Sequence, residues 1–335
     1  QERGLDALEA VPELLCKTHA DDITAIHAAY IAAGAEVVTT NTFSANRLKL
    51  GDKMSVVEAY RLAADCARAA GAPYIAGDIG PTGSLLEPMG TLSFDEAYDI
   101  FAEQVRAAVA AGCDIILVET MADLREAKAA LLAARENSTL PVFVTMTFGE
   151  DGRTFLGTTP EIAAEVISSL GAQAVGLNCS LGPAELTGAA RAMASRVRCP
   201  LMAQPNAGLP HMENGETVFD VGPEEFARAM GPLLDAGASI VGGCCGTSPR
   251  SIELLSKEIA RRGKPTPRAF KPACVLASAQ EAVVLEKGKH AVAVIGERIN
   301  PTGKKKLKAA LRSGDLDYVI GEAVTQRNSG ADVLD

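Results

Sequence analysis

The sequence lacks tryptophan, and its aromatic residues make up only 4% of 335 residues. Proteins that bind single-stranded nucleic acid usually stack its bases on aromatic side chains beside basic ones, and this chain shows no such interleaving. Its net charge is −10, and no basic stripe runs along any segment. We therefore expect no nucleic-acid partner. The short basic cluster Lys304–Lys306 is interpreted as the solvated start of a helix.

Long apolar runs are lacking as well. None approaches the ~18 residues that a membrane-spanning helix needs, so we expect no membrane partner. The first residues, Gln1–Asp6, are polar and do not follow the basic-then-apolar layout of a secretory signal. Together with eight cysteines in a spacing typical of catalytic sites, this favours a cytoplasmic, reducing location.

Histidine is scarce, and its four copies are dispersed, so a histidine-based metal site has no support. No Cys-x-x-Cys pair occurs, which argues against a zinc ribbon or a thioredoxin-type redox pair. The chain does contain two adjacent cysteines, Cys244 and Cys245, between glycines in the segment 242–247. A third cysteine, Cys179, lies in the segment 176–180.

Each of these two cysteine segments follows a short apolar run that is typical of a strand. Three thiolates at strand ends can hold a thiophilic metal and leave its fourth position open, as in a catalytic zinc site. Cys244 and Cys245 can face one metal only if the backbone turns sharply, which the flanking glycines allow. The alternative is simple core packing. We interpret the scattered cysteines in that way: Cys16, Cys66, Cys113, Cys199 and Cys274.

Short apolar segments alternate with alanine-rich helical ones, a pattern that predicts an α/β fold with parallel strands covered on both faces. The predicted strands are 36–40, 74–78, 114–119, 142–147, 174–178, 200–204 and 239–243. The predicted helices are 22–33, 55–70, 94–111, 122–135, 159–170, 183–197, 223–236 and 248–262. We expect a (β/α)8 TIM-type barrel whose first strand is missing, with a seven-stranded open sheet as the alternative.

Three regions are expected along the chain. Residues 1–262 would form the barrel, and a turn-rich stretch that begins at Gly263 would open a linker over 263–290. Residues 291–335 begin with a new apolar strand at 292–296 and stop within another apolar run. We interpret this last region as the truncated start of a second α/β barrel.

The two cysteine segments resemble the zinc motifs of the homocysteine S-methyltransferases. The segments 40–43 and 77–81 are similar to other strand ends of that family, and the resemblance covers about residues 5–262. The segment Ile295–Gly303 resembles the start of a methyltetrahydrofolate-binding domain. That order of domains is similar to the cobalamin-dependent methionine synthases. The family's first strand carries an Asp-Gly loop that nothing here matches.

The resemblance implies a chemistry and a set of site residues. Zn²⁺ held by Cys179, Cys244 and Cys245 would take homocysteine as substrate through its thiol. The methyl group would come from methylcobalamin, bound by a cobalamin domain absent from this chain and recharged by methyltetrahydrofolate. The resemblance also implies site roles for Glu119 with the substrate ammonium, Asn206 in substrate placement, and Glu297 and Asn300 with the pterin, for each of which a structural role is the alternative.

Three other functions compete with this interpretation. A cobalamin-independent homocysteine methyltransferase would use another methyl donor, such as betaine or S-methylmethionine, and would lack the second domain. A barrel enzyme could use a thiol as a metal-free nucleophile, but no histidine lies near either motif to act as its base. A non-catalytic metal-binding barrel would bind the metal without methyl transfer.

Overall fold

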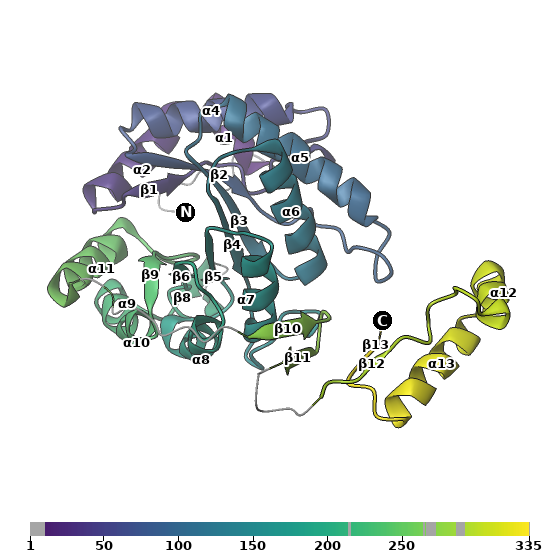
Figure 1. Ribbon diagram of the computed structural model, residues 1–335. Coiled ribbons are helices and arrows are strands. Elements are labelled where there is room, and N and C mark those ends of the chain that lie inside the picture. Colours follow the sequence, from purple (N-terminus) through teal and green to yellow (C-terminus); the bar gives the residue numbers. More distant parts are fainter. Residues whose placement is uncertain (1–10, 214–215, 264, 266–272, 286–291, 335) are drawn as a thin grey trace. The chain divides into compact units, whose positions relative to one another are not determined.

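The computed structural model describes residues 11–213, 216–263, 265, 273–285 and 292–334 (Figure 1). These residues belong to two compact units, residues 1–270 and 271–335. The predicted domain boundary at residue 262 lies close to this division.

The larger unit is built on one parallel sheet of seven strands, in the order β1-β2-β3-β4-β5-β6-β9. Every neighbouring pair along this order is parallel. The sheet curls, and helices cover its outer face (Figure 1). The strands are β1 (Val37–Thr39), β2 (Tyr74–Ile79), β3 (Ile115–Met121), β4 (Val142–Met146), β5 (Ala174–Asn178), β6 (Leu201–Gln204) and β9 (Ala238–Val241).

Helices connect the successive strands, as the predicted alternation requires. Glycines with positive φ follow five of the helices that lead into strands: Gly34, Gly71, Gly112, Gly171 and Gly237. None of the helices in the described part of the chain is long and apolar enough to cross a bilayer. The helices are η2 (Pro12–Leu14), α1 (Leu15–Thr18), α2 (Ala20–Ala32), α3 (Arg47–Leu50), α4 (Val56–Ala69), α5 (Phe94–Ala110), α6 (Leu124–Asn137), α7 (Pro160–Ser169), α8 (Pro183–Ala194), α9 (Pro223–Ala229), α10 (Gly231–Asp235) and α11 (Pro249–Arg262).

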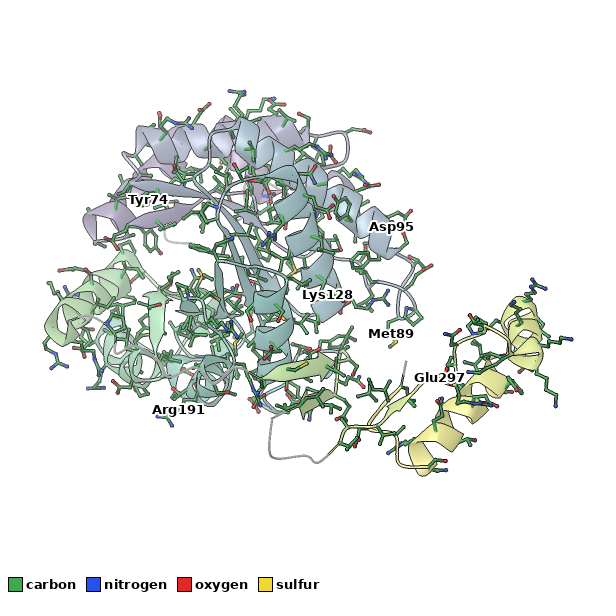
Figure 2. The ribbon with its side chains drawn as sticks, viewed as in Figure 1. Tyr74, Met89, Asp95, Lys128, Arg191 and Glu297 are labelled. Carbon is green, nitrogen blue, oxygen red and sulfur yellow. The ribbon has the colours of Figure 1, made fainter. Side chains whose placement is uncertain are left out.

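Side chains alternate between the two faces of the sheet. On the outer face, residues such as Ile75 and Ile116 join the large apolar cluster beneath the helices. On the inner face, a smaller cluster contains Ala76, Leu117 and Met202. Charged side chains such as Asp95 of α5 and Arg191 of α8 are exposed and point outward (Figure 2). Because this alternation continues to the carboxyl ends of the strands, polar residues there point toward the concave side of the sheet.

The seven predicted strands and their parallel pairing are confirmed, each strand within a few residues of its predicted bounds. Within the described residues, the strands form one open seven-stranded sheet, which was the predicted alternative to a barrel. A curled parallel sheet of this kind is also consistent with part of a TIM-type barrel. Residues 1–10, which bear on the predicted missing strand, lie outside the described residues. The prediction of one helix over 223–236 was wrong. Pro232 has no N–H to donate, and the chain forms α9 and α10 with a break at Met230.

A hairpin that the sequence did not indicate follows β6. It consists of the antiparallel strands β7 (Pro210–Glu213) and β8 (Glu216–Phe219). Phe219, at the end of β8, packs against the main apolar cluster. The hairpin therefore extends the loop region at the carboxyl end of the sheet, where the cysteine segments also lie.

The smaller unit contains a hairpin and an α/β segment. The hairpin β10 (Cys274–Ala277) and β11 (Ala282–Leu285) lies within the predicted linker, of which residues 264, 266–272 and 286–290 are outside the described residues. Next come β12 (Ile295–Gly296), α12 (Lys305–Ser313), α13 (Leu316–Asn328) and β13 (Val333–Leu334), with β12 parallel to β13. Two short strands and two helices agree with an α/β unit, and the second barrel stays a prediction.

Candidate metal centre

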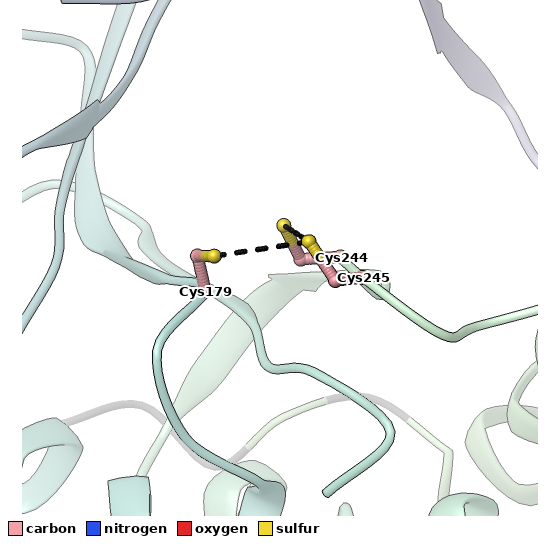
Figure 3. A group of neighbouring side chains, drawn as sticks. All are labelled: Cys179, Cys244 and Cys245. Atoms are coloured by element: carbon pink, nitrogen blue, oxygen red, sulfur yellow. Dashed lines mark hydrogen bonds between the residues drawn. The ribbon is translucent and has the colours of Figure 1, made fainter. Parts of the chain in front are cut away.

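Three cysteine sulfur atoms converge at the carboxyl ends of β5 and β9. The Sγ atoms of Cys179 and Cys245 are 3.9 Å apart, and those of Cys244 and Cys245 are 3.8 Å apart. All three sulfurs lie within 4.8 Å of one another. Figure 3 shows the side chains from the two segments pointing toward the same point. The expected convergence of these residues is thus present in the folded chain.

The spacing of the sulfurs fits a tetrahedral zinc ion. A Zn–S bond is about 2.3 Å long, so two sulfurs at tetrahedral corners lie about 3.8 Å apart. The two measured separations, 3.8 and 3.9 Å, are close to that value. Three thiolates leave one tetrahedral corner for an exchangeable ligand, as in catalytic zinc sites. The donor set therefore suits zinc in both spacing and chemistry.

Close approach also changes the ionisation of the three thiols. Hydrogen bonds from Cys244 and then Cys245 lower the pKa of Cys179. The same contact with Cys179 is the main cause that raises the pKa of Cys244 and of Cys245. The sulfurs by themselves thus favour one thiolate that accepts from two thiols. Because three thiolates this close repel one another, the fully ionised set requires a cation.

Backbone geometry places Cys179. Both Cys179 and Ser180 have positive φ, 61° and 60°, a conformation that costs energy for residues other than glycine. Hydrogen bonds hold this turn: the Cys179 N–H donates to the Gln204 carbonyl at 3.0 Å, and the Leu181 N–H donates to the Cys179 carbonyl at 2.7 Å. The turn directs the thiol away from the strand path and toward β9.

The segment after β9 is tied to the loop after β6. The Cys244 N–H donates to the Pro205 carbonyl at 2.9 Å, and the Cys245 carbonyl accepts from Ala207 N–H at 2.9 Å. Gly246 follows with φ 77°, and an added Cβ there would lie 2.4 Å from the Phe219 ring. The predicted sharp turn is therefore present. It depends on glycine both for its φ and for the close approach of Phe219 from the β7–β8 hairpin.

Asn206 was predicted to help place the substrate. In the structure, its side chain contacts Cys245 in the loop after β9. The Asn206 Oδ1 atom accepts a hydrogen bond from the Cys245 N–H at 3.1 Å, and the residue is 3% exposed. A hydrogen bond from the Asn206 side chain also lowers the pKa of Cys179. Asn206 therefore links both cysteine segments. Its contact with substrate stays a prediction.

Asn178 is a site residue that the sequence analysis did not single out. Its Oδ1 atom accepts from the Thr120 N–H at 2.9 Å and from the Thr145 hydroxyl at 2.8 Å, and its Nδ2 donates to the Thr120 hydroxyl at 2.7 Å. Thr120 has φ 59°, so this network holds an unfavourable turn directly after Glu119. The sequence did contain a signal for Asn178, because this polar residue ends a strand and immediately precedes the candidate ligand Cys179.

Glu119 lies on the concave face of β3, near the cysteines. Burial, and then the negative charge of Cys179, raise the pKa of Glu119 to about 7. Asp78 on the adjacent strand β2 is 5% exposed. Burial, and then the charges of Glu119 and Glu13, raise the pKa of Asp78 well above its usual value. The concave end of the sheet thus combines three thiols with carboxyl groups, a set that attracts cations.

Glu297 and Asn300, the predicted pterin residues, belong to the smaller unit. They lie between β12 and α12, and both are exposed. The Asn300 Oδ1 atom accepts from Thr302 N–H at 2.9 Å, and Lys304 Nζ lies 3.4 Å from the Glu297 carboxylate. The structure brings the two residues together in one loop. Their predicted role in folate binding is not tested by this geometry.

Comparison with known proteins finds a matching family model and relatives of similar sequence. The family model described as homocysteine S-methyltransferase matches residues 4–259. The methionine synthases of Mycobacterium leprae and Mycobacterium tuberculosis are each 33% identical to this chain, over 98% of its length. The matched region is 29% of each relative, so the chain spans less than a third of their length.

Solved structures with a similar fold include the homocysteine methyltransferase MmuM of Escherichia coli. Its metallated form has a TM-score of 0.63 and 20% sequence identity, covering 75% of this chain and 90% of that one. Its oxidised form also has a TM-score of 0.63 and 20% identity, covering 73% of this chain and 87% of that one. At this level of identity, the likeness shows a shared fold.

Proposed function

Since the chain belongs to the homocysteine S-methyltransferase family, we propose that its three-cysteine site binds zinc and promotes methyl transfer to homocysteine. The observation that carries this proposal is the convergence of Cys179, Cys244 and Cys245 at a spacing that fits tetrahedral zinc. The reaction converts the homocysteine thiol to the methyl thioether of methionine. The thiol loses a proton and gains a methyl group.

A thiol is a weak nucleophile until it is ionised. Zinc held by the three sulfurs would lower the pKa of a fourth, substrate thiol so that it is a thiolate at neutral pH. The protein's own residues hold the sulfurs in place. Asn206 anchors the Cys245 backbone, and Asn178 fixes the Thr120 turn beside Cys179. Such supporting hydrogen bonds strengthen metal sites by orienting the ligands.

Glu119 is proposed to pair with the ammonium group of homocysteine. It lies on the inner face of β3 and is close enough to Cys179 to be affected by its charge. Homocysteine carries its thiol and its ammonium on one short chain, so one molecule can reach both groups. An ammonium close to Glu119 would lower the pKa of that carboxyl and keep it ionised.

We propose methylcobalamin, recharged by methyltetrahydrofolate, as the source of the methyl group. The matched relatives are methionine synthases, and the match extends through the smaller unit as well as the barrel. In that unit, the loop that contains Glu297 and Asn300 would contribute to folate binding. The cobalamin domain would lie outside this chain.

Homocysteine should bind tightly only to the zinc-loaded protein. Calorimetry should show release of about one proton per site near pH 7, because the bound thiol becomes a thiolate. The proton is measured from the binding heat in two buffers with different ionisation enthalpies. Removing zinc should weaken binding by about 100-fold, because the thiolate then has no cation to stabilise it.

Homoserine, which has a hydroxyl in place of the thiol, is the matched control ligand. It retains the ammonium and carboxylate but should release no proton on mixing with the zinc-loaded protein. Equal homocysteine affinity with and without zinc would show that the cysteines do not form a substrate-activating metal site. The site would then have only a structural role.

The methyl donor can be identified by competition among donors. With homocysteine and zinc present, added methylcobalamin should give methionine at least about 10-fold faster than betaine or S-methylmethionine, because enzymes discriminate by contacts made in the transition state. Methionine is quantified by chromatography. Faster turnover with betaine or S-methylmethionine would favour a cobalamin-independent homocysteine methyltransferase.

A further inference from the structure

Asp78 is a buried carboxyl group that the chemistry described so far does not use. It follows Ala76 by two residues on β2, and Ala76 belongs to the inner apolar cluster, so the Asp78 side chain points to the concave face. The residue is 5% exposed, and its Oδ1 atom has no hydrogen-bond donor. Burying an unpartnered polar group costs free energy, so this arrangement needs a reason.

The backbone around Asp78 is firmly held. Its N–H donates to the Thr40 hydroxyl at 3.0 Å, and its carbonyl accepts from the Thr42 hydroxyl at 2.8 Å and the Tyr60 hydroxyl at 2.7 Å. These contacts use only the main chain of Asp78. The fold therefore fixes the position of the carboxyl group without itself supplying a donor to Oδ1.

Asp78 and Glu119 lie diagonally opposite each other on adjacent strands. Asp78 pairs in register with Leu117, and Glu119 is two residues farther along the same face. Diagonal neighbours on one face of a sheet lie within reach of each other's longer side chains, so one small group between them can contact both carboxyls. Glu119 is also the largest charge effect on Asp78, and no basic side chain is among the causes that shift either pKa.

We propose that Asp78 is a second carboxyl ligand of the substrate ammonium, opposite Glu119. This inference rests on the proposed function, because it places homocysteine between the metal site and β2. An ammonium has three donors and no acceptor, so it can satisfy Asp78 Oδ1 and Glu119 together. Its positive charge also returns both carboxyls to their ionised forms.

An inorganic cation fits this position less well. A metal ion needs several ligand atoms close together, and among the described residues the three cysteines are the only group of at least three candidate ligands within 4.8 Å. The carboxyls of Asp78 and Glu119 are not part of such a group. Two carboxyls that belong to no such group suit an organic ammonium, which can bind each of them through one of its N–H groups.

The test compares two thiols on the zinc-loaded protein. Homocysteine carries the ammonium, whereas 4-mercaptobutanoate is the same molecule without the amino group. Asp78→Asn should weaken homocysteine binding by about 10-fold or more, since the acceptor of the ammonium hydrogen bond loses its negative charge. It should change 4-mercaptobutanoate binding by less than about twofold. Calorimetry gives both dissociation constants, and zinc content is measured on the same samples.

Asp114→Asn is the matched control. Asp114 lies just before β3, at the opposite end of the sheet, where its carboxylate accepts the Ile75 N–H at 2.8 Å. This variant should bind both thiols as the wild type does. Asp78→Asn should also melt no lower than the wild type, because it removes a buried carboxyl whose Oδ1 atom has no donor. Asp78→Ser provides a second neutral variant if the first does not fold.

Two results would overturn the assignment of Asp78. One is an equal loss of affinity for both thiols, and the other is loss of zinc from the folded Asp78 variants; either indicates a structural role. Unchanged homocysteine affinity in both variants would overturn it too. If the wild-type protein itself fails to bind homocysteine, the proposed function fails first, and the failure is then not specific to Asp78.

Discussion

Replacing Cys244 by alanine should abolish both zinc binding and methyl transfer to homocysteine. The Sγ atom of Cys244 lies 3.8 Å from that of Cys245, and two thiolates cannot replace the charge and geometry of three. We expect zinc content to fall from about one per chain to near zero, and activity to fall by more than about 1000-fold. Elemental analysis and a methionine assay measure the two effects.

The fold should survive this change, because Cys244 is only partly buried and is not in the apolar core. Circular dichroism should show unchanged helix content. Cys274→Ala removes an exposed thiol from β10 in the smaller unit and should retain full zinc and activity. A Cys244→Ala protein with stoichiometric zinc and normal turnover would exclude Cys244 as a ligand.

Gly176→Ala should have the largest effect on stability. Gly176 lies on β5, and a Cβ added there would sit 2.1 Å from the Met202 carbonyl oxygen of β6. Backbone atoms cannot rotate away as a side chain can, so β6 would have to move. We expect a loss of about 3 kcal/mol or more in the free energy of unfolding, measured by urea denaturation. Zinc affinity should fall as well, because β6 leads to Asn206.

Gly188→Ala is the matched control for this substitution. Gly188 lies inside α8, and no atom other than its chain neighbours and the backbone of its own helix lies within 4 Å of an added Cβ. Because alanine favours helix and glycine does not, this variant should gain about 0.5–1 kcal/mol. If Gly176→Ala were as stable as the wild type, β5 and β6 could not lie so close that an added Cβ at Gly176 meets the Met202 carbonyl oxygen.

The sequence predicted most of the sheet and the candidate ligands. Apolar segments separated by glycine-terminated helices indicated seven strands, and the glycine-flanked pair identified Cys244 and Cys245. It missed Asn178, the β7–β8 hairpin and the contact between Asn206 and Cys245. The Asn206 Oδ1 atom accepts a hydrogen bond from the Cys245 N–H. That contact joins residues 39 positions apart, a relation that local patterns do not contain.

The strands and the candidate sulfur ligands could be predicted from the sequence alone, because each depends on residues within one turn or strand. Only the tertiary structure decided which residues face one another across strands. The register that sets Asp78 opposite Leu117 also brings it near Glu119. The positive φ of Cys179 turns its sulfur toward Cys245. Both depend on long-range backbone hydrogen bonds, whose geometry is set only when the sheet is assembled.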